Sequence, residues 1–319
     1  DWNVCAFGGR IAKRVKMSAL GSGFKSIAFH LEMYYPDRVE RGAPARKAEE
    51  EDNQDEERED GPIGVAGVLT LNRPERGNSI SAEMFGEMGQ VLAFVEDPRN
   101  RVGALVVTGS GRAFCTGMDL QRAAAEAAEE KEEEEKKDEG SPLALFSGLR
   151  DCAVPVVARI NGPAVAGGWG LAFCADFRVA DEGAWFSLPE TRRGIVPALI
   201  SSFIVPETGP FLAKLLMLTG RRFSAADALS LGLITAVSSP SHPLDTLVAA
   251  LVRDLLASAP AASRLTKRMV HAVAGSSSDA NRRRIVEQIA LGNFSSPEAS
   301  HGIQAFLTKK TPNWYAAKL

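Results

Sequence analysis

The chain has 319 residues, of which 45% are hydrophobic and 24% charged, and its net charge is −3 at pH 7. A chain of this length can bury a large core in one or two domains, whereas the slightly acidic balance argues against nucleic-acid binding driven by phosphate neutralisation. No apolar run approaches the roughly 20 residues that a membrane-spanning helix needs, so we expect no transmembrane segment.

Several catalytic signatures are missing. The four cysteines form no CxxC pair, the four histidines form no HExxH pattern, and a GxSxG elbow and a Walker A loop are also absent. These absences argue against zinc, serine-hydrolase and P-loop chemistry, and we expect no bound metal. Cys115, Cys152 and Cys174 stand in apolar surroundings, which predicts buried core thiols rather than disulfides.

Residues 1–62 are predicted to form an N-terminal extension that is basic and then acidic. Between Trp2 and Leu31 five residues are basic and none is acidic, as in an organelle transit segment. The stretch from Glu49 to Asp60 is densely acidic, as in a disordered linker. The extension is then a flexible leader, which we favour, or an arm that docks on a partner.

Residues 63–210 are predicted to form a core in which strands alternate with helices. A charged insertion at 121–140 interrupts it, and this insertion lacks the large apolar residues that a buried helix face needs. The expected elements are strands at Gly67–Leu71, 104–108, 154–160, 177–180 and 184–187, a helix from Ser81, its N-cap, to Val95, and a short helix from Gly168.

Residues 211–319 are predicted to form a C-terminal helical region, and the chain is predicted to be mainly helical from Pro197 onward. The apolar spacing and the cap residues predict helices at Pro210–Leu218, Ser224–Leu231, Leu244–Ala257, Pro260–Ala274, Asp279–Leu291 and Pro297–Leu307.

Two glycine-containing loops follow buried strands. Asn161–Gly170 follows an apolar run and opens a helix, and Arg112–Leu120 follows the strand at 104–108. A new helix start leaves free N–H groups, which suit an oxygen atom that gains negative charge. Taken alone, the first glycine cluster could equally serve close packing of strand and helix. Two such loops together could offer one N–H each to the same carbonyl oxygen.

These loops stand among six motifs that occur in the order found in one family. The motifs are Leu71–Pro74 with Asn78, Ala113–Asp119, Asn161–Gly170, Phe186–Glu190 with Gly194 and Pro197, Gly220–Ala225 with Ala228, Gly232 and Leu233, and Phe306–Trp314. From about Gly67 to Leu319 the chain thus resembles the crotonase, or enoyl-CoA hydratase/isomerase, superfamily. The resemblance implies an α/β fold with a ββα spiral core and a C-terminal helical trimerisation region.

The resemblance also implies the site. The backbone N–H groups of Met118 and Gly167 would form an oxyanion hole for the thioester oxygen of an acyl-CoA. Glu190 would be the catalytic base, whereas the position of a first hydratase glutamate is Gly170 here. Four basic residues match positions that can contact CoA in the family, although each could be ordinary surface charge. They are Arg73, Arg76, Lys309 and Lys310.

A single glutamate favours one reaction. Moving a double bond from carbons 3,4 to carbons 2,3 needs only one base, so Gly170 with Glu190 looks like a Δ3,Δ2-enoyl-CoA isomerase of fatty-acid β-oxidation. Acyl-CoA would be its substrate, with no further cofactor. The segment 197–202 departs from the glycine-rich loop of simple hydratases.

Two alternatives stay open. Some hydratases of branched or carboxylated enoyl-CoA share the glycine. The fold could also serve as a non-catalytic or moonlighting subunit of a larger mitochondrial assembly, such as a respiratory complex, through the N-terminal extension.

Location and assembly are further expectations. The basic N-terminus suggests mitochondria, whereas Ala317-Lys318-Leu319 resembles a peroxisomal address. The family resemblance implies a trimer, either of identical chains or mixed with related subunits.

Overall fold

The computed structural model describes residues 4–7, 10–15, 24–34, 63–119 and 141–315. The acidic stretch 49–60, the insertion 121–140 and the C-terminal residues 317–319 lie outside these ranges, so the expectations placed on them stay predictions.

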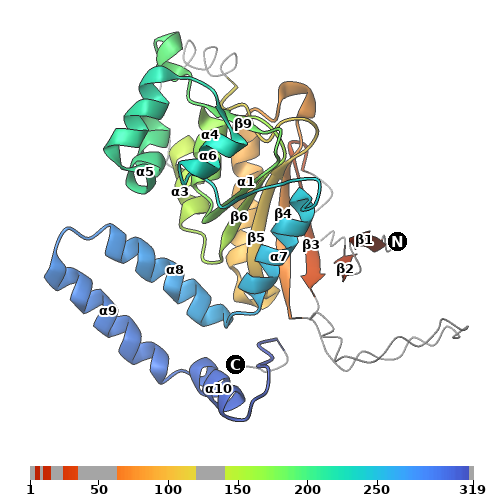
Figure 1. The fold of residues 1–319 in the computed structure, drawn as a ribbon. Helices are drawn as coiled ribbons and strands as arrows, with labels where there is room; N and C mark the ends of the chain where they lie inside the picture. Colours follow the sequence, from red (N-terminus) through yellow and green to blue (C-terminus); the bar gives the residue numbers. More distant parts are fainter. Residues whose placement is uncertain (1–3, 8–9, 16–23, 35–62, 120–140, 316–319) are drawn as a thin grey trace, which may run out of the picture.

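Eight strands form the main sheet, which runs through the middle of the molecule (Figure 1). The first three strands pair antiparallel, whereas β4, β5, β6, β8 and β11 are mutually parallel. In sheet order they are β1 (Val4–Phe7), β2 (Arg10–Val15), β3 (Ile27–Tyr34), β4 (Gly64–Leu71), β5 (Val102–Gly109), β6 (Val156–Ile160), β8 (Phe177–Ala180) and β11 (Ala236–Val237).

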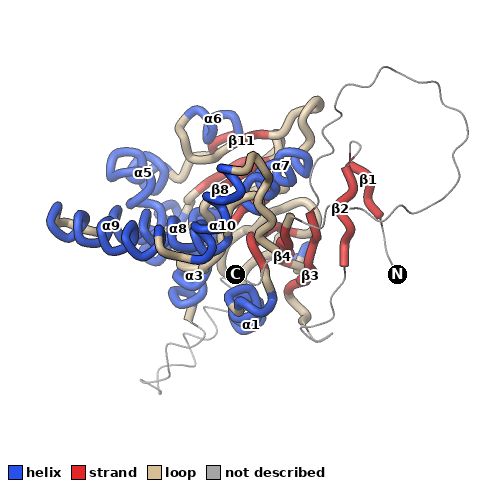
Figure 2. The backbone as a smooth tube through the Cα atoms, turned by 90° about the horizontal axis from the view of Figure 1, so that it is seen from below, coloured by secondary structure: helices blue, strands red, loops and turns tan. Residues whose placement is uncertain are grey.

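The core begins well before residue 63, which corrects the predicted N-terminal extension. Strand β3 pairs with β4 along its whole length, and Ile27 and Leu31 are buried in the main core. The carboxylate of Glu87 accepts hydrogen bonds from the backbone N–H groups of Lys25 (2.7 Å) and Ser26 (3.0 Å). Figure 2 shows β1 and β2 beyond β3, at one side of the molecule.

Helices cover both faces of the sheet because side chains along each buried strand alternate between them. Leu69 and Leu71 of β4 join a cluster with α1 (Ala82–Glu96) and α3 (Pro142–Arg150), whereas Ala66 and Val68 face α7 (Leu244–Leu256). The predicted N-cap of α1 is confirmed, since the Ser81 hydroxyl accepts the N–H of Met84. Helix α3, which opens on Pro142 after the charged insertion, was not predicted.

A second, three-stranded sheet lies beside the main one. Its order is β10 (Phe223–Ser224), β9 (Trp185–Ser187), β7 (Ala164–Val165), and the short helix α4 (Gly167–Phe173) follows β7 directly. Trp169 of α4 is fully buried, and its ring centroid lies 4.9 Å from that of Phe186 in β9. Helix α6 (Ala225–Ser230) continues from β10 and carries a capping box at Ser224.

Helix α5 (Ala198–Thr219) is longer than the predicted helix Pro210–Leu218. It is broken at Gly209, whose φ of 69° is not helical, and its first turn includes most of the segment 197–202. Among the described residues α5 alone is a single helix long and apolar enough to cross a membrane. Ile200, Phe203, Ile204 and Leu216 nevertheless belong to the protein core, so this helix gives weak evidence for a membrane span.

The last three helices form an arm that projects from the sheet core (Figure 1). They are α8 (Pro260–Ala274), α9 (Asp279–Phe294) and α10 (Pro297–Leu307), close to the predicted bounds. No residue of α8 or α9 is fully buried, although the Lys267 side chain is 8% exposed, and Leu291, Phe294 and Phe306 are 76%, 74% and 81% exposed. The ion pair between Lys267 and Asp176 (2.7 Å) joins α8 to the core.

Candidate active site

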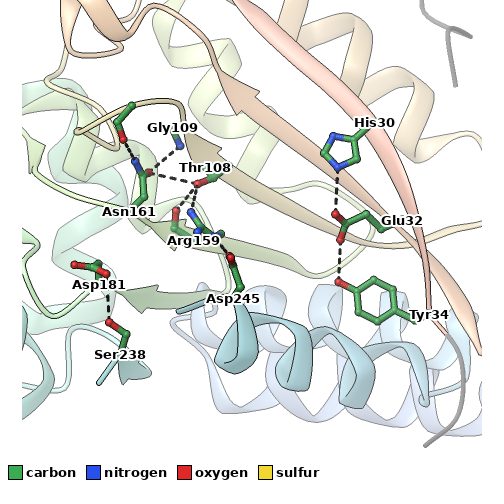
Figure 3. A network of polar contacts seen from close by, with 11 residues as sticks. His30, Glu32, Tyr34, Thr108, Gly109, Arg159, Asn161, Asp181, Ser238 and Asp245 are labelled. Carbon is green, nitrogen blue, oxygen red and sulfur yellow. Dashed lines mark hydrogen bonds and ion pairs between the residues drawn. The ribbon is translucent and has the colours of Figure 1, made fainter. Parts of the chain in front are cut away.

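Two asparagines, the buried Asn78 and the half-buried Asn161, hold the loop that follows β5. The amide nitrogen of Asn78 donates to the carbonyl oxygens of Ser110 and Ala113, both at 2.8 Å. The side chain of Asn161 bonds the same loop: its oxygen accepts the N–H of Gly109 (3.1 Å), and its nitrogen donates to the carbonyl of Gly111 (3.0 Å). Figure 3 shows Asn161 beside Gly109 and Thr108 at the carboxyl ends of β5 and β6. The loop is therefore fixed from both sides.

The residues after this loop run between two neighbouring segments. Cys115 pairs with Ala164, and Met118 pairs with Ile80 through the bonds Ile80 N–H to Gly117 (2.8 Å) and Asp119 N–H to Ile80 (3.1 Å). In such a parallel pairing the N–H of Met118 points away from Ile80. Among the described residues this N–H donates no hydrogen bond. It is thus free to bind an oxygen atom.

The second free N–H belongs to Gly167, the first residue of α4. Ala166, which precedes it, has φ 52° and ψ −130°, a strained backbone for a residue other than glycine. The N–H of Ala166 donates a hydrogen bond to the carbonyl of Ser187 (2.9 Å). The ψ angle of Ala166 sets the orientation of the peptide plane that carries the Gly167 N–H. That N–H likewise donates no hydrogen bond among the described residues.

The two N–H groups lie side by side. A Cβ atom built on Gly167 would lie 3.6 Å from the backbone nitrogen of Met118, and one built on Gly117 would lie 3.1 Å from the nitrogen of Gly167. Gly117 also has φ 94°, so position 117 needs glycine both for its backbone and for the close approach. The two loops singled out in the sequence therefore meet, and paired donors of this kind can stabilise a developing oxyanion.

Glu190 begins a short 3₁₀ helix (Glu190–Arg193), three residues after Ser187 of β9. Because β9 pairs with β7, which leads into Gly167, the carboxylate belongs to the same corner of the fold. Its Oε2 atom is buried and has no hydrogen-bond partner among the described residues. Burial raises the pKa of Glu190, and a hydrogen bond from its own backbone N–H and the nearby charge of Arg193 oppose this only in part. Arg192 turns away and donates to the carbonyl of Thr219.

Position 170 offers no room for a second carboxylate. A Cβ atom on Gly170 would overlap Cγ2 of Ile200 and would lie 2.8 Å from its Cβ and 3.3 Å from Cε1 of Phe146. Ile200 and Phe146 are 3% and 0% exposed. The space that a longer side chain would need is filled by the first turn of α5.

The predicted CoA-binding residues fall into two separate groups. Arg73 and Arg76 lie in the loop after β4, at the site end of the sheet, and Arg73 is engaged with the carbonyl of Ser79 (2.8 Å) and with Asp119 (3.2 Å). Lys309 and Lys310 follow α10 and are exposed.

The tail that continues from these lysines packs at the other end of the sheet. The Tyr315 hydroxyl would lie 2.9 Å from a Cβ on Gly64, at the start of β4. Within one chain the two lysines therefore do not join the site.

The sequence analysis missed three contributors. The roles of Asn78 and Asn161 in bracing the loop depend on contacts across the fold, although both stand in the quoted motifs. The contact of Ile200 with Gly170 was missed entirely, and its only signal was the absence of glycine in segment 197–202. The buried thiols were predicted correctly: Cys115, Cys152 and Cys174 are buried, and burial raises the pKa of Cys115 to about 12.

Known proteins resemble this chain in sequence and in fold. Residues 62–317 match the family model described as enoyl-CoA hydratase/isomerase. The chain is 34% identical over 254 residues to enoyl-CoA hydratase AKT6-1 of Alternaria alternata, covering 78% of this chain and 81% of that protein.

It is 36% identical over 254 residues to carnitinyl-CoA dehydratase of Salmonella enteritidis, covering 77% and 93% of the two chains. The structure superposes on an enoyl-CoA hydratase/isomerase from Marinobacter aquaeolei with a TM-score of 0.71, at 28% identity and with 78% and 95% of the chains covered.

Proposed function

The chain belongs to the enoyl-CoA hydratase/isomerase family of enzymes acting on acyl-CoA, and from this premise we propose that it is a Δ3,Δ2-enoyl-CoA isomerase with one catalytic base, Glu190. The observation that carries the proposal is that only one of the two positions where hydratases of this family carry a glutamate holds one here. Glu190 is present with a buried, unpartnered oxygen, whereas position 170 holds glycine in a space filled by Ile200.

The reaction needs one proton to move. The N–H groups of Met118 and Gly167 bind the thioester oxygen, which makes the C2 protons of the acyl chain more acidic. Glu190 removes one of them, and the electron pair is delocalised over the thioester oxygen and the 3,4 double bond. Glu190 then returns the proton to C4 on the same face, and the double bond lies between C2 and C3. Each preorganised N–H is worth about 3–4 kcal/mol on the developing charge.

The raised pKa of Glu190 suits this role. A base close in pKa to its working pH accepts a proton readily and also releases it, and isomerisation needs both steps. Burial is the main cause of the raised pKa. The unpartnered oxygen supports the same role, because a buried carboxylate with a purely structural function would be paired.

A second candidate is hydration of a branched or carboxylated enoyl-CoA. The names of the relatives favour it, since one is an enoyl-CoA hydratase and another a carnitinyl-CoA dehydratase. The third candidate, a non-catalytic subunit of a mitochondrial assembly, has less support, because the paired N–H groups and the unpartnered Oε2 atom of Glu190 would then have no use. We also propose that the enzyme is mitochondrial, on the basis of its basic N-terminus.

The assembly that we propose is a trimer, of identical or mixed chains. It would cover the apolar side chains of α9 and α10 that are exposed in the described part of the single chain. It would also bring Lys309 and Lys310 to a neighbour's site, where their charge can bind CoA phosphates, whereas Arg73 and Arg76 lie at the site of their own chain.

The test is turnover of the purified chain on a 3-enoyl-CoA, with hydration of a 2-enoyl-CoA measured in parallel. We expect isomerisation, and we expect Glu190→Gln to lower it by about 10²–10⁴-fold. The control is Glu182→Gln, an exposed glutamate near the same small sheet, which should keep full activity. Hydration of a carboxylated or branched substrate without isomerisation would favour the second candidate.

A further inference from the structure

The first turn of α5 closes one wall of the site. Ile200 stands over Gly170 with Phe146 beside it, and all three residues are buried. The Phe146 ring lies 5.8 Å, between centroids, from that of Phe203, which α5 also supplies. This wall is apolar, and none of its side chains can hold a water molecule by a hydrogen bond.

The wall lies next to the oxyanion hole. Gly167 and Gly170 are three residues apart in α4 and therefore lie on the same helix face, about one turn or 5 Å from each other. A Cβ on Gly167 points to the nitrogen of Met118, and a Cβ on Gly170 points to Ile200. With the thioester oxygen bound between Met118 and Gly167, the wall stands beside the C2–C4 portion of the acyl chain.

We propose that Ile200 is a specificity-determining residue: it fills the place of a second carboxylate and its water, so that the enzyme transfers a proton without adding water. This proposal rests on the proposed single-base function and explains what maintains it. Gly170 alone would leave a gap that water can enter, whereas Gly170 under Ile200 leaves none.

The reaction that Ile200 would prevent is the addition of water to the 2,3 double bond. In hydration, one carboxylate takes a proton from water, the oxygen forms a bond to C3, and the π electron pair moves to C2 and the thioester oxygen. A carboxylic acid then gives a proton to C2, and the product is a 3-hydroxyacyl-CoA. Two carboxyl groups that share one water make this step easiest, and the water must fit between them.

The experiment restores that space and supplies the missing group. Alanine at position 200 would keep its Cβ 2.8 Å from a Cβ at 170, so the double variant Gly170→Glu with Ile200→Gly is needed. The readout is the ratio of crotonyl-CoA hydration to 3-hexenoyl-CoA isomerisation in one preparation, because a ratio does not depend on the fraction of folded enzyme. We expect the ratio to rise by about 10²-fold or more.

Two further variants keep the test decisive if the double variant folds poorly. Ile200→Ala, with Gly170 kept, opens the wall without adding a carboxylate, and we expect a smaller rise in the same ratio. Gly170→Glu with Ile200 kept should lose both activities and thermal stability, because the new side chain overlaps Ile200. A merely structural Ile200 would predict that Ile200→Ala lowers both rates equally and leaves the ratio unchanged.

The outcomes for this inference and for the proposed function are separable. Wild-type isomerisation tests the proposed function by itself. A folded double variant that binds crotonyl-CoA but hydrates it no faster than wild type would overturn the role of Ile200. So would a wild-type enzyme that already hydrates crotonyl-CoA as fast as the double variant.

Discussion

The sheet core and the helical arm of this chain differ in how far their apolar residues are buried. In the core, β4, β5 and β6 are covered on both faces, and their carboxyl ends carry loops held by Asn78 and Asn161. In the arm, no apolar residue of α8 or α9 is buried, and large apolar residues of α9 and α10 stay exposed. The comparison teaches that the core can form the candidate site by itself, whereas the arm exposes the kind of apolar surface that packs against another chain.

The largest effect is expected for Gly117→Ala, which tests whether the active site lies in the core. The new Cβ would lie 3.0 Å from the Cβ of Ala166 and 3.1 Å from the nitrogen of Gly167, in a backbone that disfavours alanine. We expect a loss of about 10²–10³-fold in kcat, as for removal of one oxyanion donor.

Gly86→Ala is the matched control for Gly117→Ala. Gly86 lies exposed on α1 with no atom within 4 Å of a new Cβ. Alanine there should keep the activity and stabilise the helix by about 0.5–1 kcal/mol. Equal loss of activity in both variants would contradict the placement of the site.

The next largest effect is expected in the arm. Leu291→Asp together with Phe294→Asp places charge on two residues that are 76% and 74% exposed in the single chain. If these residues pack on a partner, each loses about 2–3 kcal/mol of buried apolar contact, and the assembly should dissociate. Sedimentation measures the mass, and Arg283→Asp, an exposed polar position on the same helix, is the control. An unchanged mass would refute the proposed role of the arm.

One glutamate in the core and one in the arm make the same kind of contact, because each accepts two backbone N–H groups. Glu87 of the core binds the N–H groups of Lys25 and Ser26, and Glu298 of the arm binds those of Ala261 (2.9 Å) and Ala262 (2.8 Å). Each alanine substitution should cost about 1–3 kcal/mol. For Glu87→Ala the loss should appear in global unfolding, and for Glu298→Ala in hydrogen exchange of α8 alone. The reverse pattern would mean that the arm folds with the core.

The smallest effect concerns pH. Because burial raises the pKa of Glu190, its carboxylate is protonated over a wider acid range, and kcat should fall on the acid side at a pH above the ordinary glutamate value. A raised folded-state pKa means that ionisation disfavours the folded state. Glu190→Gln should therefore raise Tm slightly at neutral pH and leave it nearly unchanged below the unfolded pKa. A lower Tm at neutral pH would argue for a paired, structural carboxylate.

How much could be predicted from sequence depended on whether the signal was local. Helices α8 and α10 begin at prolines and follow apolar periodicity, so their bounds were predicted correctly. Strand β3 was missed because its basic surroundings indicated a leader, and only its pairing with β4 and the contact with Glu87 make it part of the core. The meeting of Met118 with Gly167 followed from the family resemblance, whereas the contact of Ile200 with Gly170 joins two helices and has no local signature.

The pair formed by Gly170 and Ile200 also restricts how this enzyme can change during evolution. A glutamate at 170 is blocked while isoleucine occupies 200, and a small residue at 200 leaves a gap while 170 is glycine. Neither single substitution gives a working two-carboxylate site, so a lineage must pass through a less stable intermediate. The gap is the milder of the two intermediates, since a cavity lowers stability whereas an overlap also forces neighbouring atoms to move. We therefore expect position 200 to change first, and we expect relatives that carry glutamate at 170 to carry a small residue at 200.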